Sequence, residues 1–446
     1  MAKKPTSVEI RSYQVGFGDC FLLSFIYDKN DKRHVLIDFG TGELPKRGKP
    51  RKPAKPSEHM PKVAEQIHKD SGGKLIAVIA THRHSDHISG FGTDNKTGKS
   101  GKIIAGLKPK VVIQPWTEDP KAAKDATHAT KDSQRSAKGF IAGLAAMHSI
   151  AEAVLALTEK PPIWMGAALV KELRFLGMDN IRNLSAIKNL IAMGEVPGAK
   201  AVWARHGSNA GLGRLLPGVK VHVLGPPSLV QSQKIRKQRS RDADQFWHLL
   251  AGPLALRDQA PLAWGLGQPG RAGRVRPTPP EGRWFRDRLQ RMRGEQLLEI
   301  VRSLDAQMNN TSLILLFEVG GKKLLFPGDA QIENWSYAIK DASDRQTTRK
   351  LLADVDVYKV GHHGSLNATP KKLLWERFTK RGSTKGNRLT TVLSTMPGKH
   401  GSSGKKTEVP RRTLLDALDK ESDLLNTDDL KFGAEPEMCQ VIKLHL

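Results

Sequence analysis

One stretch, Thr81 to His87, constrains the fold more than any other part of this sequence. It reads Thr-His-Arg-His-Ser-Asp-His and follows the apolar run Leu75 to Ala80, whose length and composition predict a buried strand. His82 and His84 alternate, so their side chains point the same way in an extended chain. Imidazole and carboxylate groups bind zinc, manganese or iron. Three histidines and an aspartate at one strand end therefore predict a metal site.

Other predicted strands end in the same ligand types, far away in the sequence. Lys322 to Phe326 leads to Asp329, and Val355 to Val360 leads to His362 and His363. One sheet can bring strand ends together, which would supply enough ligands for two metals with Asp329 as a bridge. A two-metal site activates a water and clamps the oxygens of a displacement at phosphorus.

A third strand end, in the run His34 to Gly40, carries Asp38. We expect this aspartate to orient the ligand loop by hydrogen bonding its backbone. Apolar runs predict further strands over residues 8–27, 110–116, 219–227, 311–319, 390–395 and 439–446, and helices over 61–70 and 410–422. The pattern is typical of one α/β domain over residues 1–446, with a helical insertion at 120–210 and a basic insertion at 228–306.

Positive charge dominates the composition, with a formal net charge of +27. Such a balance attracts polyanions, most commonly nucleic acid and next an anionic membrane surface, although it can also serve solubility alone. Basic residues crowd the loop 43–61, and arginines interleave with Trp284 and Phe285 in the second insertion. Both segments could contact phosphates, or could simply present a solvated charged face.

Several features indicate the compartment. The two cysteines, Cys20 and Cys439, exclude a disulfide framework and a cysteine-rich zinc site and fit a reducing compartment. The polar N-terminus lacks a signal-peptide core. No apolar run is long enough to cross a bilayer. We therefore expect a cytoplasmic protein.

The motifs together resemble the metallo-β-lactamase superfamily, and specifically the soluble metallo-hydrolase domain of ComEC-type DNA-uptake proteins. They cover roughly residues 7–118, 215–230 and 308–446 and not the two insertions. The resemblance rests on Val15 to Cys20, Asp38 to Gly40, His82 to Gly90, Asn309 to Leu313, Phe326 to Asp329 and Gly361 to Ser365.

This resemblance implies an αββα four-layer sandwich with two divalent ions, zinc or manganese, at one edge of the sheets. It assigns His82, His84 and Asp329 to the first metal, and Asp86, His87, Asp329 and His362 to the second. Asp86 would also orient the attacking hydroxide, and His363 would contact the scissile group or donate to the leaving oxygen. Asp38 would be the structural support, and Asn310, Ser365 and His400 would contact substrate.

Two departures from the superfamily pattern concern histidines. A further histidine ligand often lies between the first cluster and the Gly-Asp motif, and His206 and His222 are the candidates. A Gly-His-Pro motif near the end is replaced by a region in which His400 could stand in.

The leading prediction is a metal-dependent phosphodiesterase or nuclease that acts on DNA or RNA through a metal-activated hydroxide. One alternative is a metallo-hydrolase of a small substrate, such as a cyclic nucleotide, another phosphodiester, a lactone or a thioester, since the same fold hosts all of these. A second is a non-catalytic nucleic-acid-binding module. The sequence does not predict the oligomeric state.

Overall fold

The chain forms two compact units. The first contains Met1–Ala137, Arg182–Ile235 and Met308–Leu446, and the second contains Lys138–Ile181 and Arg236–Gln307. The computed structural model describes residues 3–47, 52–120, 158–159, 161, 165–167, 169–170, 173, 183–232, 308–365, 367–382, 387–399, 408–432 and 437–446. Most of the second unit, the arginine-rich stretch and His400 lie outside these residues.

The first sheet combines an antiparallel half with a parallel half. Its seven strands are, in spatial order, β15 (Cys439–His445), β1 (Ser7–Tyr13), β2 (Cys20–Ile26), β3 (Lys32–Phe39), β6 (Ala77–Ile79), β7 (Val111–Pro115) and β8 (Lys200–Ala204). The strands from β15 to β3 pair antiparallel, and those from β3 to β8 pair parallel. Strand β2 is buried along nearly its whole length, which is the pattern of a strand covered on both faces.

The second sheet has six strands and is also mixed. Their order is β14 (Asp423–Asn426), β13 (Thr390–Leu393), β12 (Val357–Lys359), β11 (Lys322–Phe326), β10 (Ile314–Val319) and β9 (Val219–Gly225). The predicted Gly320-Gly321 turn joins β10 and β11, which pair antiparallel. A separate two-stranded hairpin consists of β4 (Lys46–Arg47) and β5 (Lys52–Pro53).

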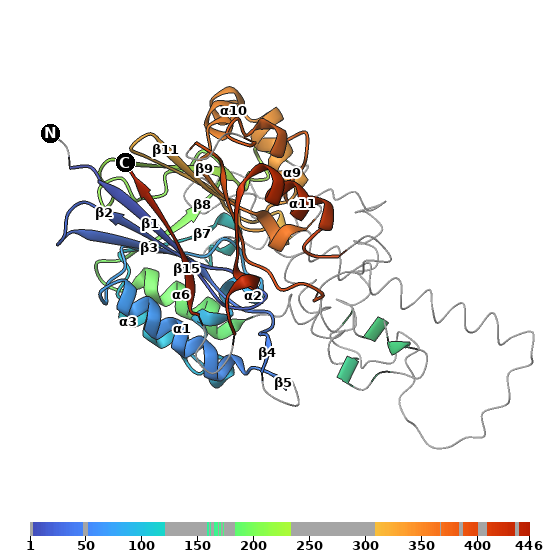
Figure 1. The fold of residues 1–446 in the computed structure, drawn as a ribbon. Coiled ribbons are helices and arrows are strands. Elements are labelled where there is room, and N and C mark those ends of the chain that lie inside the picture. Colours follow the sequence, from blue (N-terminus) through green and yellow to red (C-terminus); the bar gives the residue numbers. More distant parts are fainter. Residues whose placement is uncertain are drawn as a thin grey trace, which may run out of the picture. The chain divides into compact units, whose positions relative to one another are not determined.

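Helices cover the outer face of each sheet (Figure 1). On the first sheet lie α1 (Pro56–Asp70), α3 (Ser100–Gly106) and α6 (Leu184–Glu195), and near the second lie α9 (Ile332–Ser336), α10 (Arg345–Ala353) and α11 (Arg412–Glu421). The two sheets share the central core, where Phe21 meets Phe326 at 5.6 Å between ring centroids and Phe25 meets Phe317 at 6.0 Å. The predicted αββα sandwich is confirmed.

The part of the chain predicted as a helical insertion also contributes to this sandwich. Helix α6 packs its apolar face on the first sheet, and β8 extends that sheet through parallel pairing with β7. Both belong to the first unit. The insertion boundaries stay predictions. Within the described residues, no helix combines the length and apolar character needed to span a bilayer.

The strand order brings the ends of several strands to one edge of the sandwich. Strands β3 and β6 are parallel neighbours in the first sheet, as are β11 and β12 in the second. Strands β6, β11 and β12 are each followed by one of the predicted ligand segments, and β3 carries Asp38 near its end. Leu313, just before β10, donates its backbone N–H to the carbonyl of Thr81 at 2.9 Å. This bond ties the second sheet to the histidine loop.

Gly40 makes the turn from β3 possible at this edge. A Cβ on Gly40 would lie 2.4 Å from the carbonyl carbon of Asp86 and 2.4 Å from the backbone nitrogen of His87. These atoms belong to the short helix α2 (Ser85–Ile88). No side chain can relieve such a contact because both partners are backbone atoms.

We expect Gly40→Ala to destabilise the protein by about 2 kcal/mol or more, since α2 must move to admit a methyl group. Chemical denaturation followed by circular dichroism measures this change. Gly106→Ala in α3 is the matched control, because a Cβ there meets no atom within 4 Å. Equal unfolding midpoints for the two variants would show that α2 does not depend on this close approach.

Candidate metal centre

Six buried side chains converge at the edge where the two sheets meet. They are His82, His84, Asp86, His87, Asp329 and His363, each at most 2% exposed. The first four come from the loop after β6 and from α2, and the last two follow β11 and β12. Two sets of ligand atoms within this group each lie within 4.8 Å of one another.

The larger set has the dimensions of a tetrahedral metal site. Nε2 of His87 lies 3.1 Å from Oδ2 of Asp329 and 3.8 Å from Oδ1 of Asp86. Nε2 of His363 lies 2.9 Å from Oδ2 of Asp86 and 3.7 Å from Oδ2 of Asp329. Ligands about 2.1 Å from a tetrahedral ion are about 3.4 Å from each other. The four residues therefore fit one divalent ion without large movement.

Unsatisfied polar atoms in this set point to the same conclusion. Within the described residues, Nε2 of His87, Oδ1 of Asp86 and Oδ2 of Asp329 are buried and make no hydrogen bond. Buried polar atoms without partners cost free energy. Their convergence on one point fits a site for a metal ion.

The second set consists of His82, His84 and Asp86. Nε2 of His82 lies 3.0 Å from Nδ1 of His84, as expected for side chains that alternate along an extended loop. Asp86 belongs to both sets, so its two carboxylate oxygens could serve neighbouring ions. The sequence had suggested Asp329 for this bridging position.

Asp38 supports the ligand loop through three contacts. Its carboxylate accepts hydrogen bonds from Thr81 N at 2.7 Å and Thr81 Oγ1 at 2.7 Å, and lies 2.8 Å from His87 Nδ1. The register of β2 against β3 shifts here, because Cys20 pairs with Phe39 while Phe21 pairs with Ile37. Asp38 is thus the extra residue of a bulge, with a left-handed φ of 54°, and bulges re-aim side chains near active sites.

Both histidines of the larger set have their second ring nitrogen occupied. Nδ1 of His87 faces Asp38, and Nδ1 of His363 lies 2.8 Å from the carbonyl of Ser394, to which it must donate. This assignment leaves the lone pair of each Nε2 directed at the cluster, as in metal sites whose histidines are oriented by outer partners. Phe17 packs on the His363 ring, 4.4 Å between centroids.

The pKa values of His82 and His87 are shifted in opposite directions. Burial and the neighbouring His87 hold the pKa of His82 well below its usual value, so this ring stays neutral and able to bind a metal. Burial also opposes charge on His87, but Asp329, Asp86 and Asp38 outweigh it and raise the pKa of His87. Burial raises the pKa of Asp86, yet His87 and His363 overcome it and hold that pKa at about 2. The carboxylate stays ionised.

The two histidines after β12 occupy different places. His363 is fully buried and stands in the larger set, in the position that the resemblance gave to His362. The His362 side chain is 18% exposed, with Nε2 3.8 Å from Oδ2 of Asp329 and Nδ1 2.9 Å from Ser365 Oγ. Both have a left-handed φ, 45° and 50°. Strained backbone of this kind is typical of functional sites.

The other predicted residues lie around or away from this cluster. Asn310 is buried and donates to Glu333 Oε2 at 3.2 Å. His206 lies 2.8 Å from the carbonyl of Leu224 through Nδ1 and 2.8 Å from Asp344 Oδ1 through Nε2, so both ring nitrogens have partners. His222 faces Glu318 at 3.1 Å on β9. Neither histidine appears in the two sets.

Two residues at the centre were not among the predicted site residues. Asp19 lies behind the larger set, 3.6 Å from His87 Nδ1 and 3.7 Å from His363 Nδ1. Lys359, the last residue of β12, is buried and contacts both Asp19 and Asp329. The available signal was a lysine among Val357, Tyr358 and Val360, just before His362 and His363.

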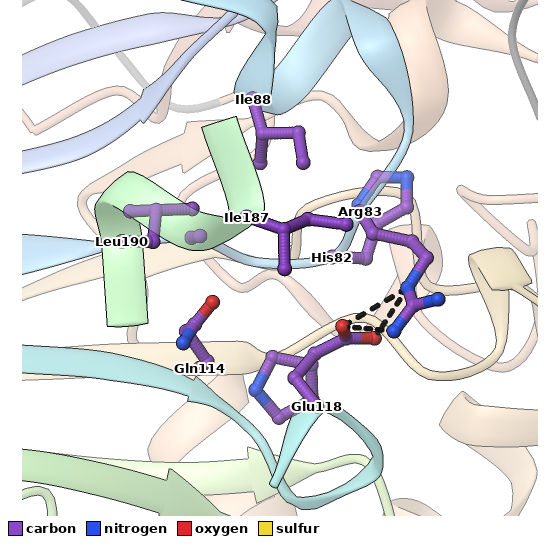
Figure 2. Close-up of a pocket in the computed structure, with 9 residues that line it drawn as sticks. His82, Arg83, Ile88, Gln114, Glu118, Ile187 and Leu190 are labelled. Carbon is purple, nitrogen blue, oxygen red and sulfur yellow. Dashed lines mark hydrogen bonds and ion pairs between the residues drawn. The ribbon is translucent and has the colours of Figure 1, made fainter. Parts of the chain in front are cut away.

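Arg83, between two predicted ligands, lines a small pocket together with Glu118 (Figure 2). Its Nε donates to both carboxylate oxygens of Glu118 at 2.9 Å. His82, Ile88 and Leu190 also line this pocket. The ion pair anchors the ligand loop to the segment that follows β7.

The family model of the metallo-beta-lactamase superfamily matches residues 14–112. This range includes Asp19, Asp38 and the histidine loop, whereas Asp329 and His363 lie beyond it. No curated protein matches the chain. The match and the buried cluster suggest a metal-dependent hydrolase.

Replacing Asp38 by asparagine tests the support of the ligand loop. Asparagine tolerates the left-handed backbone, but it loses the charge and one of the two acceptor atoms. We expect Asp38→Asn to weaken metal binding by about 10- to 100-fold, measured by competition with a chromophoric chelator.

Asp356→Asn is the matched control for this variant. Asp356 accepts from the backbone nitrogen of Lys323 at 2.9 Å, but it lies at the opposite end of β12 from the cluster. An equal metal affinity in both variants would contradict a specific role for Asp38.

Proposed function

We propose that this chain, whose residues 14–112 match the metallo-beta-lactamase superfamily, is a metal-dependent phosphodiesterase that acts on DNA or RNA. The superfamily match and the convergence of His and Asp ligands support hydrolysis. The net charge of +27 supports a polyanionic substrate. ComEC-type hydrolase domains are the proposed relatives because of the motif order described above.

The proposed ligands are the two sets, with His362 beside them. Divalent ions, zinc or manganese, would there activate water and neutralise charge on the phosphorus oxygens. Asp86 would hold the attacking water in line, because its carboxylate belongs to both sets. His363 joins the proposed ligands because its Nε2 lies among the other three donors. The partly exposed His362 is then the histidine better placed to meet the substrate or the leaving oxygen.

One observation carries the choice of substrate: a basic hairpin starts next to the centre. A Cβ on Gly42 would lie 3.6 Å from Cβ of Asp86. The same loop is tied to Phe17, which packs on His363, by Gly42 N to Phe17 O at 2.6 Å and Phe17 N to Glu43 O at 2.8 Å. Strands β4 and β5 follow at once and contain Lys46, Arg47 and Lys52. The ammonium of Lys46, at the start of β4, could contact phosphates that flank a scissile bond.

The activity test compares nucleic acids with small substrates. Purified protein is incubated with manganese or zinc and with single-stranded DNA, double-stranded DNA, RNA, a cyclic nucleotide, a lactone and a thioester. We expect cleavage of nucleic acid and a loss of at least about 10³-fold in His82→Ala/His84→Ala, since metal ions supply several kcal/mol of transition-state stabilisation.

The other outcomes of that test distinguish between the alternative functions. If the unmodified protein cleaved nucleic acid no faster than the double variant, the proposal would be contradicted. Turnover of only a small substrate would favour the small-molecule hydrolase. Salt-sensitive nucleic-acid binding that survives in the double variant, without turnover, would favour a binding module.

The hairpin, together with the lysine between it and α1, is tested separately by Lys46→Ala/Lys55→Ala. Removing two cations should weaken nucleic-acid binding and reduce the slope of log affinity against log salt by up to about 2. Hydrolysis of a small phosphodiester should stay unchanged.

Lys220→Ala/Lys443→Ala is the matched control for the hairpin. Both lysines are exposed, and they lie near the strand ends that point away from the centre, opposite Glu318 and Glu9. If both double variants had the same salt slope, the hairpin would not be the phosphate contact.

A further inference from the structure

A lysine lies at the back of the proposed metal centre. Lys359 ends β12, and its side chain is only 2% exposed. Its ammonium donates to the carbonyl of Gly328 at 3.1 Å, lies 3.4 Å from Oδ1 of Asp329, and forms an ion pair with Asp19 Oδ2. Lysine is almost never fully buried unless it is paired. These contacts therefore have to stabilise the charge.

Asp19 links this lysine to the ligand histidines. Its carboxylate faces Nδ1 of both His87 and His363, at 3.6 and 3.7 Å. Its backbone nitrogen donates to the carbonyl of Asp86 at 2.8 Å, and its carbonyl accepts from Gly40 N at 3.0 Å. Lys359 thus joins the N-terminal motif of the first sheet to Asp329 of the second.

Asp19 and Asp38 also form a third set of candidate ligands with His87. In this set Nδ1 of His87 lies 2.8 Å from Asp38 and is committed to that hydrogen bond. The ammonium of Lys359 already contacts Asp19. A protein cation therefore pairs with Asp19, and a ring proton is shared with Asp38, which favours the other two sets as the metal ligands.

The charges of the centre explain why a cation is needed behind it. Asp19, Asp38, Asp86 and Asp329 are all buried, and unpaired buried carboxylates are costly. Burial opposes a charge on Lys359, but Asp19 and Asp329 attract its proton more strongly and raise its pKa above the usual value. The ammonium therefore places a positive charge between two buried carboxylates.

We propose that Lys359 is the resident counter-ion of this centre and a positioning residue for Asp329. Its ammonium neutralises Asp19 and holds Oδ1 of Asp329, so that Oδ2 faces the ligand set. The counter-ion part concerns the metal-free protein, whereas the positioning part rests on the proposed metal centre. The two parts are measured by different signals.

Three variants separate these roles. Lys359→Met removes the charge and keeps most of the side-chain length, and Asp19→Asn/Lys359→Met removes both charges of the ion pair. Lys323→Met is the matched control, since Lys323 pairs with the exposed Asp354 at 3.1 Å on β11. Each variant is melted with chelator and with manganese, and its cobalt(II) absorption spectrum is recorded.

We expect Lys359→Met to melt several degrees below the unmodified protein in chelator, and manganese to raise its melting temperature by more than it raises that of the unmodified protein. The double variant should recover most of the loss in chelator, because the side chain at position 19 is then neutral and needs no buried cation beside it. Its cobalt spectrum should still be shifted, as in Lys359→Met, because Asp329 has lost its anchor. Lys323→Met should match the unmodified protein in both signals.

Other results would overturn the inference. Equal melting of Lys359→Met and Lys323→Met in chelator, or no recovery in the double variant, would reject the counter-ion role. Unchanged cobalt spectra would reject the positioning role. If Lys359→Met does not fold, a folded double variant supports the counter-ion, and an unfolded one rejects it. Failure of the unmodified protein to bind cobalt would reject the metal centre and leave the melting comparison in chelator intact.

Discussion

The compensation of buried negative charge is the constraint on which this structure depends. Four aspartates, Asp19, Asp38, Asp86 and Asp329, lie within the contact between the two sheets. Carboxylates in such a place repel one another and have lost their water. Backbone amides, histidine rings and the ammonium of Lys359 offset part of this cost. Oδ1 of Asp86 and Oδ2 of Asp329, which make no hydrogen bond, belong to residues of the larger ligand set.

Residues that contact the proposed ligands set the orientation of those ligands. Asp38 and the carbonyl of Ser394 occupy the Nδ1 atoms of His87 and His363, which directs each Nε2 inward. The backbone carries strain in the same place, because Asp38, His362 and His363 account for three of the five non-glycine residues with positive φ in the described chain. Dense packing around these residues has to hold them there.

Most strands of the sandwich could be predicted from the local pattern of apolar residues. The apolar runs before the histidine loop, around Gly320-Gly321 and before His362 became β6, β10, β11 and β12. Strand β8 escaped prediction because only its last residue is buried and it lies within a helical stretch. Helix α1 begins at Pro56, five residues before the predicted start at Pro61. Proline suits the first turn of a helix, and the sequence contains two that could begin it.

The sequence by itself determined the ligand types and their placement after strands, because period-2 patterns and histidine-rich loops are local properties. Only the tertiary structure decided which atoms meet. Past the end of β12 the chain turns with φ near 45° and 50°, and that turn buries His363 and leaves His362 partly exposed. The pairing of Asp19 with Lys359 spans 340 positions along the chain, as their residue numbers show. A contact between two sheets leaves no periodic signal in either segment.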